Sequence, residues 1–168
     1  MILRAAREGI TSEIYIHAGF IIFFSLLTLE YTLGNVGVWN RFNIPWIKTV
    51  GNILYIPSAF FVISSLISLK HKGKPQTRDF TTSTIFINTG IYGIIRQPMT
   101  LGMGIWSIAL VFVFQSFLSI ILGVLSFFCF WISARKEAEY NIRKFGEVYK
   151  EYMEKVPMWN IFIGLKKK

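Results

Sequence analysis

Long apolar segments, separated by polar turns and flanked by charged tails, dominate the chain. The first segment covers residues 14–33, with His17 and Glu30 near its two ends. The second covers residues 47–69 and has no charged residue after Lys48. An apolar segment of about 18 residues or more predicts a helix that spans a membrane. Each of these segments is therefore predicted to form one transmembrane helix.

The third apolar stretch, residues 99–133, is too long for one membrane span. It contains 35 residues without a charge. A single helix of that length would measure about 52 Å, whereas the hydrocarbon core of a bilayer is only about 30 Å thick. We therefore predict two short spanning helices, residues 99–115 and 117–133, joined by a tight turn near Gln115 and Ser116.

The chain after residue 133 mixes charged and apolar residues. The apolar ones recur at spacings of three and four residues: Ile142, Phe145, Tyr149, Tyr152 and Val156. This spacing predicts an amphipathic helix over residues 134–156, with Gly146 inside it and Pro157 ending it. It either continues the last span or bends at the interface.

Together these elements predict one membrane domain over residues 1–168. It is an all-α integral membrane protein with four transmembrane helices, the last two forming a short hairpin. A long cytoplasmic loop (residues 70–98) and a cytoplasmic amphipathic C-terminal helix complete it.

The composition is typical of a membrane protein, and the distribution of charge predicts which side of the membrane the termini occupy. Only 16% of the residues are charged, whereas soluble domains carry about 25%. The net charge is +9, and with four spans 16 of the 18 Lys and Arg residues fall on the side of both termini. The other side has only Arg41 and Lys48. Cytoplasmic loops carry such an excess, so both termini are predicted to be cytoplasmic, and we expect no nucleic-acid partner. The lysines at 166–168 are interpreted as an anchor to anionic lipid.

Familiar catalytic motifs are missing from the sequence. His17 and His71 are too far apart to suggest a metal site, and none is expected. Gly102 and Gly104 lie inside an apolar helix, where close helix packing explains them better than nucleotide binding. Glu30 is expected near the outer end of its helix, within reach of water.

Two positions carry candidate chemistry. Arg96 precedes the charge-free stretch; it either snorkels to the interface or holds a carboxylate with its planar fork. Glu137 shares a helix face with Asn141. Such carboxylates are usually solvated or pair with a neighbour, as Glu139 could with Arg143; the alternative is a buried partner for a cationic ligand.

These segments together resemble the membrane methyltransferases of the isoprenylcysteine carboxyl methyltransferase type, which include phospholipid N-methyltransferases. Two motifs around a helical hairpin carry the resemblance. The first retains Gly90, Tyr92, Arg96, Pro98 and Gly102, and the second retains Glu137, Phe145, Gly146, Tyr149, Tyr152, Val156 and Pro157. The chain departs from the family pattern at Gln97 (family His), Thr100 (Tyr), Ala138 (Glu) and Asn141 (Leu).

The resemblance implies an enzyme that transfers a methyl group from S-adenosylmethionine to a lipophilic acceptor at the cytoplasmic face. The partners are then the bilayer and a lipophilic or lipidated substrate; the oligomeric state stays open. Arg96 and Glu137 are the candidate catalytic residues. The candidate cofactor-binding residues are Tyr92, Gln97, Thr100, Leu101, Gly102, Glu137, Asn141, Tyr149 and Tyr152. Glu137 could offset the positive charge of the cofactor. The rings of Tyr149 and Tyr152 either face a cation or pack at the interface.

Other interpretations remain open at this level. A nicotinamide-dependent membrane reductase on a related scaffold has a similar C-terminal pattern but more spans. A non-enzymatic transporter or scaffold would give Glu30 a role, since carboxylates within membranes are usually functional. The acceptor could be a carboxylate, an amine or a thiol.

Overall fold

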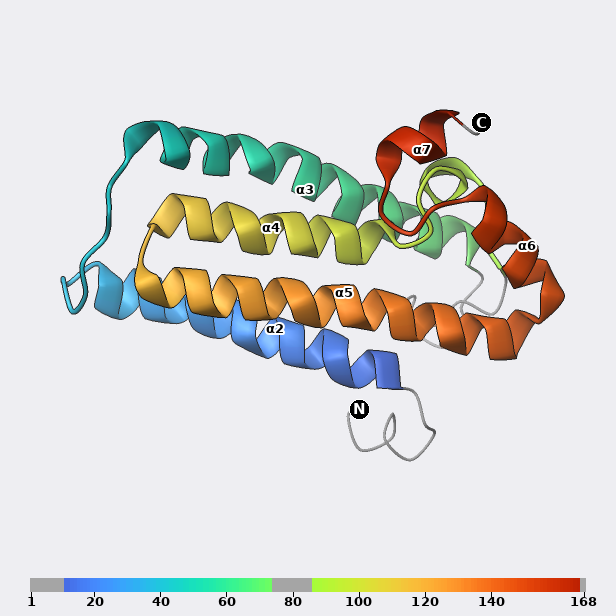
Figure 1. The fold of residues 1–168 in the computed structure, drawn as a ribbon, viewed down its shortest axis with the longest axis horizontal. Coiled ribbons are helices and arrows are strands. Elements are labelled where there is room, and N and C mark those ends of the chain that lie inside the picture. The colour runs from blue at the N-terminus through green and yellow to red at the C-terminus, as the bar shows by residue number, and fades with distance from the viewer. Residues whose placement is uncertain (1–10, 74–85, 167–168) are drawn as a thin grey trace.

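The computed structural model describes residues 11–73 and 86–166, and in this part the chain is all-helical (Figure 1). The one β-type pairing among these residues is an isolated bridge between Arg41 and Ser116. The elements in chain order are α2 (Thr11–Leu29), a π-helix η1 (Glu30–Gly34), α3 (Pro45–Lys72), a 3-10 helix η2 (Gly90–Gly93), α4 (Pro98–Phe114), α5 (Phe117–Phe145), α6 (Glu147–Lys155) and α7 (Ile161–Lys166). Residues 74–85 of the predicted loop lie outside the described residues.

The four long helices form an open arc. α2 packs on α5, α5 on α4, and α4 on α3, whereas α2 and α3 make no extensive contact with each other. Figure 1 shows α3 and α2 on different sides of the α4–α5 pair. The short helices α6 and α7 gather near the end of the bundle at which α4 begins, which we call the Pro98 end. The opposite end is the Gln115 end.

Three helical segments of the described residues are long and apolar enough to cross a membrane: Thr11–Gly34, Pro45–Lys72 and Phe117–Phe145. They support an integral membrane protein. α4 is apolar but has only 17 residues. At about 1.5 Å per residue it measures roughly 26 Å, which is shorter than a hydrocarbon core of about 30 Å. Its role as a fourth span therefore stays a prediction.

The turn between α4 and α5 lies where the sequence predicts it. Gln115 ends α4 in the left-handed conformation, with φ 52°. Ser116 begins α5 with a capping box, in which its side chain accepts from the Ser119 N–H and the Ser119 side chain accepts from the Ser116 N–H. The Gln115 amide also bonds both backbone groups of Ile44, at 2.7 and 2.9 Å. The turn thereby holds the α2–α3 connection at this end.

The C-terminal amphipathic helix was wrongly predicted as one helix over residues 134–156. α5 instead runs without interruption to Phe145, the chain turns at Gly146, and α6 follows. Gly146 has φ +63°, a conformation that residues with a Cβ rarely adopt, so glycine here ends a helix rather than lying inside one. The predicted apolar face is nevertheless buried: Tyr149, Tyr152 and Val156 cluster with Ala138.

Small residues bring the helices close together, as predicted for Gly102 and Gly104. A Cβ on Gly102 would lie 2.9 Å from the Ser58 carbonyl oxygen of α3, and the Ser58 hydroxyl donates to the Gly102 carbonyl at 2.8 Å. A Cβ on Gly104 would meet Phe127 and Trp159 at 3.3 Å. Close backbone approach and short polar bonds of this kind stabilise helix pairs in lipid, where water provides no driving force.

The expectation that Glu30 contacts water was wrong. Its side chain is fully buried at the Gln115 end and forms an ion pair with Arg41, at 2.8 Å between Oε2 and Nη2. Trp39 Nε1 donates to Oε1 at 3.3 Å, and the Ser116 hydroxyl donates to the same oxygen. The chain after η1 folds back and brings Arg41 over the carboxylate, which the sequence pattern alone did not indicate.

Candidate active site

The two sequence motifs meet at the Pro98 end of the bundle. The Arg96 N–H donates to the Pro157 carbonyl at 3.0 Å, and the Gln97 N–H donates to the Met158 carbonyl at 3.4 Å. Two segments far apart in the sequence therefore lie side by side. Pro98 then begins α4, at a position where the missing proline N–H leaves no helix bond unmade.

Gln97 and Glu137 form the polar centre of this region. The buried Gln97 side chain donates a hydrogen bond to the Glu137 carboxylate. The Thr100 hydroxyl donates to the Gln97 carbonyl at 3.2 Å, and Trp159 Nε1 donates to the Thr100 hydroxyl at 3.4 Å. A carboxylate has about four acceptor positions, so Glu137 retains capacity to accept from a bound cation.

Two nitrogen atoms of the Arg96 guanidinium group have no hydrogen-bond acceptor in the described part of the chain. Its Nε and Nη1 atoms are buried and have no hydrogen-bond partner among the described residues. The side chain does bond Tyr149. Buried polar groups are nearly always paired, because an unpaired one loses its hydration without compensation. Two guanidinium nitrogens of Arg96 are therefore available to donate hydrogen bonds to an anionic group.

Aromatic side chains enclose the same region. The Tyr152 hydroxyl donates to the Tyr92 carbonyl at 2.5 Å, and the hydroxyls of Tyr92 and Ser65 are 2.6 Å apart. The Phe86 ring lies 4.8 Å from the ring of Tyr152 and 5.6 Å from that of Tyr149. The sequence interpretation missed Phe86; its apolar side chain within a turn-rich loop was the available signal.

The tyrosines of this region are neutral hydrogen-bonding groups. Burial raises the pKa of Tyr92, Tyr149 and Tyr152 above the usual range. Asn141 Nδ2 donates to the Tyr149 hydroxyl at 3.4 Å, and the charges of Glu137 and Arg96 both act on Tyr149. Tyr149 therefore lies close to both charged candidates.

Not every predicted site residue lies in this group. Leu101 packs with Phe61 and Ile95 in an apolar cluster, and Gly102 faces Ser58 of α3. Glu139 does pair with a neighbour, which is one of the options that the sequence left open, but that neighbour is Lys136 rather than Arg143.

The ion pair of Lys136 and Glu139 lies on the exposed side of α5, with 2.9 Å between Nζ and Oε2. Trp159 was not recognised as a contact of Thr100, since nothing in the local sequence pattern links residues 59 positions apart.

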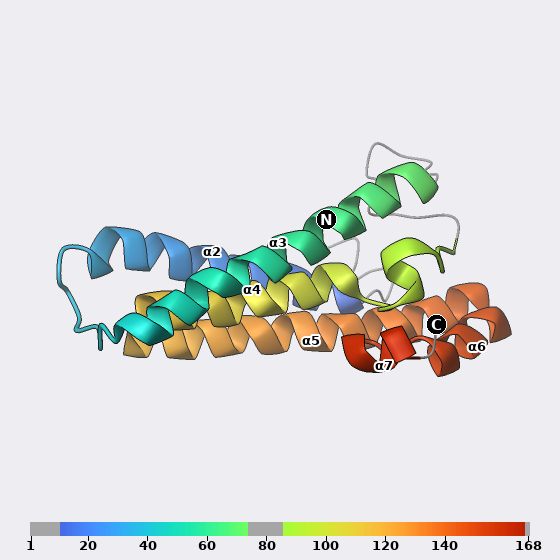
Figure 2. The same cartoon turned by 90° about the horizontal axis from the view of Figure 1, so that it is seen from above.

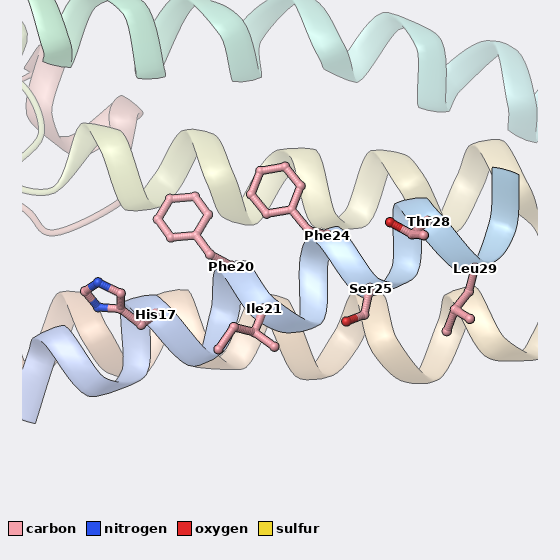
Figure 3. Close-up of a pocket in the computed structure, with 7 residues that line it drawn as sticks. All are labelled: His17, Phe20, Ile21, Phe24, Ser25, Thr28 and Leu29. Carbon is pink, nitrogen blue, oxygen red and sulfur yellow. The ribbon is translucent and has the colours of Figure 1, made fainter. Parts of the chain in front are cut away.

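A hollow on α2 is a separate feature (Figure 3). Its lining comes from this helix alone: His17, Phe20, Ile21, Phe24, Ser25, Thr28 and Leu29. His17 Nδ1 is already bonded to the Glu13 carbonyl at 2.6 Å. No charged side chain converges on this hollow, so it carries no chemistry comparable to that of the Pro98 end. Within residues 11–73 and 86–166, no group of three His, Cys, Asp or Glu side chains could hold a metal ion.

The comparison with protein families agrees with this arrangement. The family described as phospholipid methyltransferase matches residues 46–148, and the chain belongs to this family of integral membrane methyltransferases. A search of curated proteins found no match, and neither did a search of solved structures.

The matched region contains α4, α5 and all but the first residue of α3, together with Arg96, Gln97 and Glu137. Tyr149, Tyr152 and the segment that contacts Arg96 and Gln97 from the C-terminal side lie beyond it.

Proposed function

We propose that this protein transfers a methyl group from S-adenosylmethionine to a lipophilic acceptor that enters from the bilayer. The reaction takes place at the cytoplasmic face. In this arrangement α4 is a fourth, short span, and both termini are cytoplasmic. The charge distribution supports that orientation, because 16 of the 18 Lys and Arg residues then face the cytoplasm.

The observation that carries the proposal is the pair of unpartnered Arg96 nitrogens beside Tyr149, a side chain on which the charge of Glu137 also acts. S-adenosylmethionine has an anionic carboxylate and two cationic groups, an ammonium and a sulfonium. Nε and Nη1 of Arg96 supply donors for an anion, and Glu137 supplies acceptors for a cation. One ligand with both kinds of charge fits this pair better than a purely apolar or purely cationic molecule does.

When bound, S-adenosylmethionine supplies the methyl group, which passes to a heteroatom of the acceptor. The residues of this chain act by binding and orientation. Gln97 holds the Glu137 carboxylate, and Glu137 balances the positive charge of the ligand. Arg96 binds an anionic group, either the cofactor carboxylate or a carboxylate or phosphate of the acceptor. Orientation of reactants alone can lower a barrier by about 7–11 kcal/mol, so no protein nucleophile is required.

Calorimetric titration of the detergent-purified protein with S-adenosylmethionine and S-adenosylhomocysteine tests the proposal. We expect saturable binding that weakens in Glu137→Ala by about 10- to 150-fold, the effect of losing a charged hydrogen bond of about 1.5–3 kcal/mol. Glu139→Ala is the matched control, since Glu139 lies on the same helix but is exposed and bonded to Lys136. A folded wild-type protein that binds neither compound would refute the proposal.

Arg96→Lys separates the two roles of the arginine. Lysine keeps the positive charge but loses the planar fork. If Arg96 holds the cofactor, this variant binds S-adenosylhomocysteine more weakly. If it holds the acceptor, binding of the cofactor is unchanged and methyl transfer from bound S-adenosylmethionine falls.

A further inference from the structure

The chain after α6 returns to the candidate active site and forms what we call the C-terminal strap, residues 157–166. Its first two carbonyls accept the backbone N–H groups of Arg96 and Gln97. Trp159 donates to the Thr100 hydroxyl at 3.4 Å. Farther along, a Cβ on Gly164 would lie 2.0 Å from the Ile94 carbonyl oxygen, so α7 is pressed against the segment that precedes Arg96.

The strap lies beside the apolar part of the bundle rather than beyond it. The Trp159 ring is 5.7 Å from that of Phe127 in α5 and lies next to Gly104 in α4. Gly104 follows Pro98 by six residues, or about 9 Å along the helix. Both views of the fold place α7 beside the end of α4 at which it begins (Figures 1 and 2). Trp159 therefore lies against the apolar surfaces of α4 and α5, close to the Pro98 end of the bundle.

The outer surface of α7 is apolar and ends in positive charge. Phe162 is 85% exposed and Leu165 is 55% exposed, and these residues share one helix face because they are three positions apart. Lys166 is exposed at the end of the helix, and the sequence continues with Lys167 and Lys168. Apolar side chains next to lysines, at the edge of an apolar bundle, match a bilayer interface with anionic headgroups.

We propose that the C-terminal strap binds the anionic phospholipid of the cytoplasmic leaflet and that this contact holds the candidate active site in its binding conformation. Phe162 and Leu165 insert at the boundary of the acyl chains, and Lys166 contacts the headgroups. The strap transmits this contact through its backbone bonds to Arg96 and Gln97 and through Trp159 to Thr100. Anionic lipid is thereby an activator of the site; its effect on ligand affinity rests on the proposed function.

The test compares the full-length protein in nanodiscs of neutral phosphatidylcholine with nanodiscs that contain about 30% phosphatidylserine as the anionic lipid. The first measurement is the immersion of a spin label at Phe162→Cys, with Cys129→Ser as background. We expect the label to collide with oxygen and to be shielded from a water-soluble nickel chelate in the anionic discs. A label open to the chelate in both lipids overturns the proposal.

The second measurement is amide hydrogen exchange of the peptide that covers Ile94–Thr100. This readout needs no ligand, so it remains decisive if the protein binds no S-adenosylmethionine and the proposed function fails. We expect slower exchange in anionic discs. Equal exchange in the two lipids overturns the coupling between strap and site.

The third measurement is the affinity for S-adenosylhomocysteine. We expect it to fall several-fold in neutral discs and in a variant with all three terminal lysines changed to glutamate, by at most about fivefold per lysine. Lys150→Glu is the control for the reversal of one such charge elsewhere, because it changes a single lysine on α6, where Lys150 is paired with Glu147. Equal affinity in both lipids, or equal loss in the control, overturns the proposal that the strap governs binding.

Discussion

The buried ion pair of Glu30 and Arg41 is predicted to make a large, measurable contribution to the stability of the fold. The Glu30 side chain is fully buried, while the Arg41 side chain is 21% exposed. Removing the arginine leaves a buried carboxylate without a counter-ion, and such a loss costs about 3–5 kcal/mol. Removing the charge of Glu30 is milder, because Arg41 still reaches Asn35 Oδ1 and the Glu30 carbonyl. We expect Glu30→Gln to cost about 1–3 kcal/mol, the strength of a charged hydrogen bond.

Thermal unfolding in detergent, followed by circular dichroism, measures both effects. For a chain of this size 1 kcal/mol shifts Tm by about 2–4 °C. Arg41→Ala should therefore lower Tm by roughly 6–20 °C, and Glu30→Gln by roughly 2–12 °C. In the double variant no buried charge is left without its partner. Its destabilisation should be smaller than the sum of the two single effects.

Two results would refute this reasoning. One is a Tm of Arg41→Ala within 1–2 °C of wild type, roughly the effect of a surface substitution. The other is strict additivity in the double variant, because independent effects exclude an interaction between the two side chains. Lys48→Ala is a suitable control, since Lys48 is charged and on the same side of the bundle but forms no salt bridge within the described residues.

Three further predictions concern the site, the helix contact and the orientation. Arg96→Met should leave the Tm of the ligand-free protein unchanged or raise it, because a cation with two buried, unpaired nitrogens is removed; a fall of several degrees would show that Arg96 is mainly structural. Gly102→Ala should cost about 1–3 kcal/mol in a denaturant titration, because its Cβ meets the Ser58 carbonyl at 2.9 Å; an unchanged midpoint contradicts that contact. A reporter enzyme fused to the C-terminus that is active only in the cytoplasm should be active, and an inactive but expressed fusion contradicts the proposed orientation.

Buried tyrosine also makes stability depend on pH. Because burial raises the pKa of Tyr152, the folded protein keeps the phenol proton more tightly than the unfolded chain does. Stability should be constant from neutral pH to about pH 10, where tyrosine ionises in the unfolded chain, and should fall at higher pH. Tyr152→Phe should flatten that fall while lowering Tm near pH 7, since the bond to the Tyr92 carbonyl is lost. Parallel Tm curves from pH 8 to 11 would contradict this assignment.

Local sequence patterns were sufficient where neighbouring residues determine the structure, as at the turn between α4 and α5. The length of the charge-free stretch predicts a hairpin, and its turn forms at Gln115 and Ser116. The same patterns failed where one residue decides between continuation and a break. Gly146 lies within a regular apolar spacing, yet its positive φ ends the helix.

Contacts between distant residues were beyond local patterns. The pairing of Glu30 with Arg41 depends on how the chain folds back after α2, and the bond from Trp159 to Thr100 depends on the course of the strap. For the candidate site, the family motifs indicated Arg96, Gln97 and Glu137. They gave no sign that two nitrogens of Arg96 would be buried without acceptors, because that depends on every neighbouring side chain.

The open arc has a consequence for biosynthesis. α2 is made well before α5 and lies outside the region matched by the family, yet α5, its packing partner, begins about 90 residues after α2 ends. At the usual speed of translation α2 waits on the order of ten seconds for α5. The hydroxyl groups that join the two helices, Ser126 to the Gly19 carbonyl and Ser133 to the Ser12 carbonyl, are all donated by α5.

At these two contacts α2 supplies only backbone carbonyl groups. It therefore enters the bilayer with no side-chain hydroxyl there that waits for a partner. The buried carboxylate of Glu30, which begins η1 directly after α2, finds its counter-ion only 11 residues later in the same chain. The ion pair can form as soon as this segment has been made. The order of synthesis thus supplies Arg41, the counter-ion of Glu30, long before it supplies α5, the packing partner of α2.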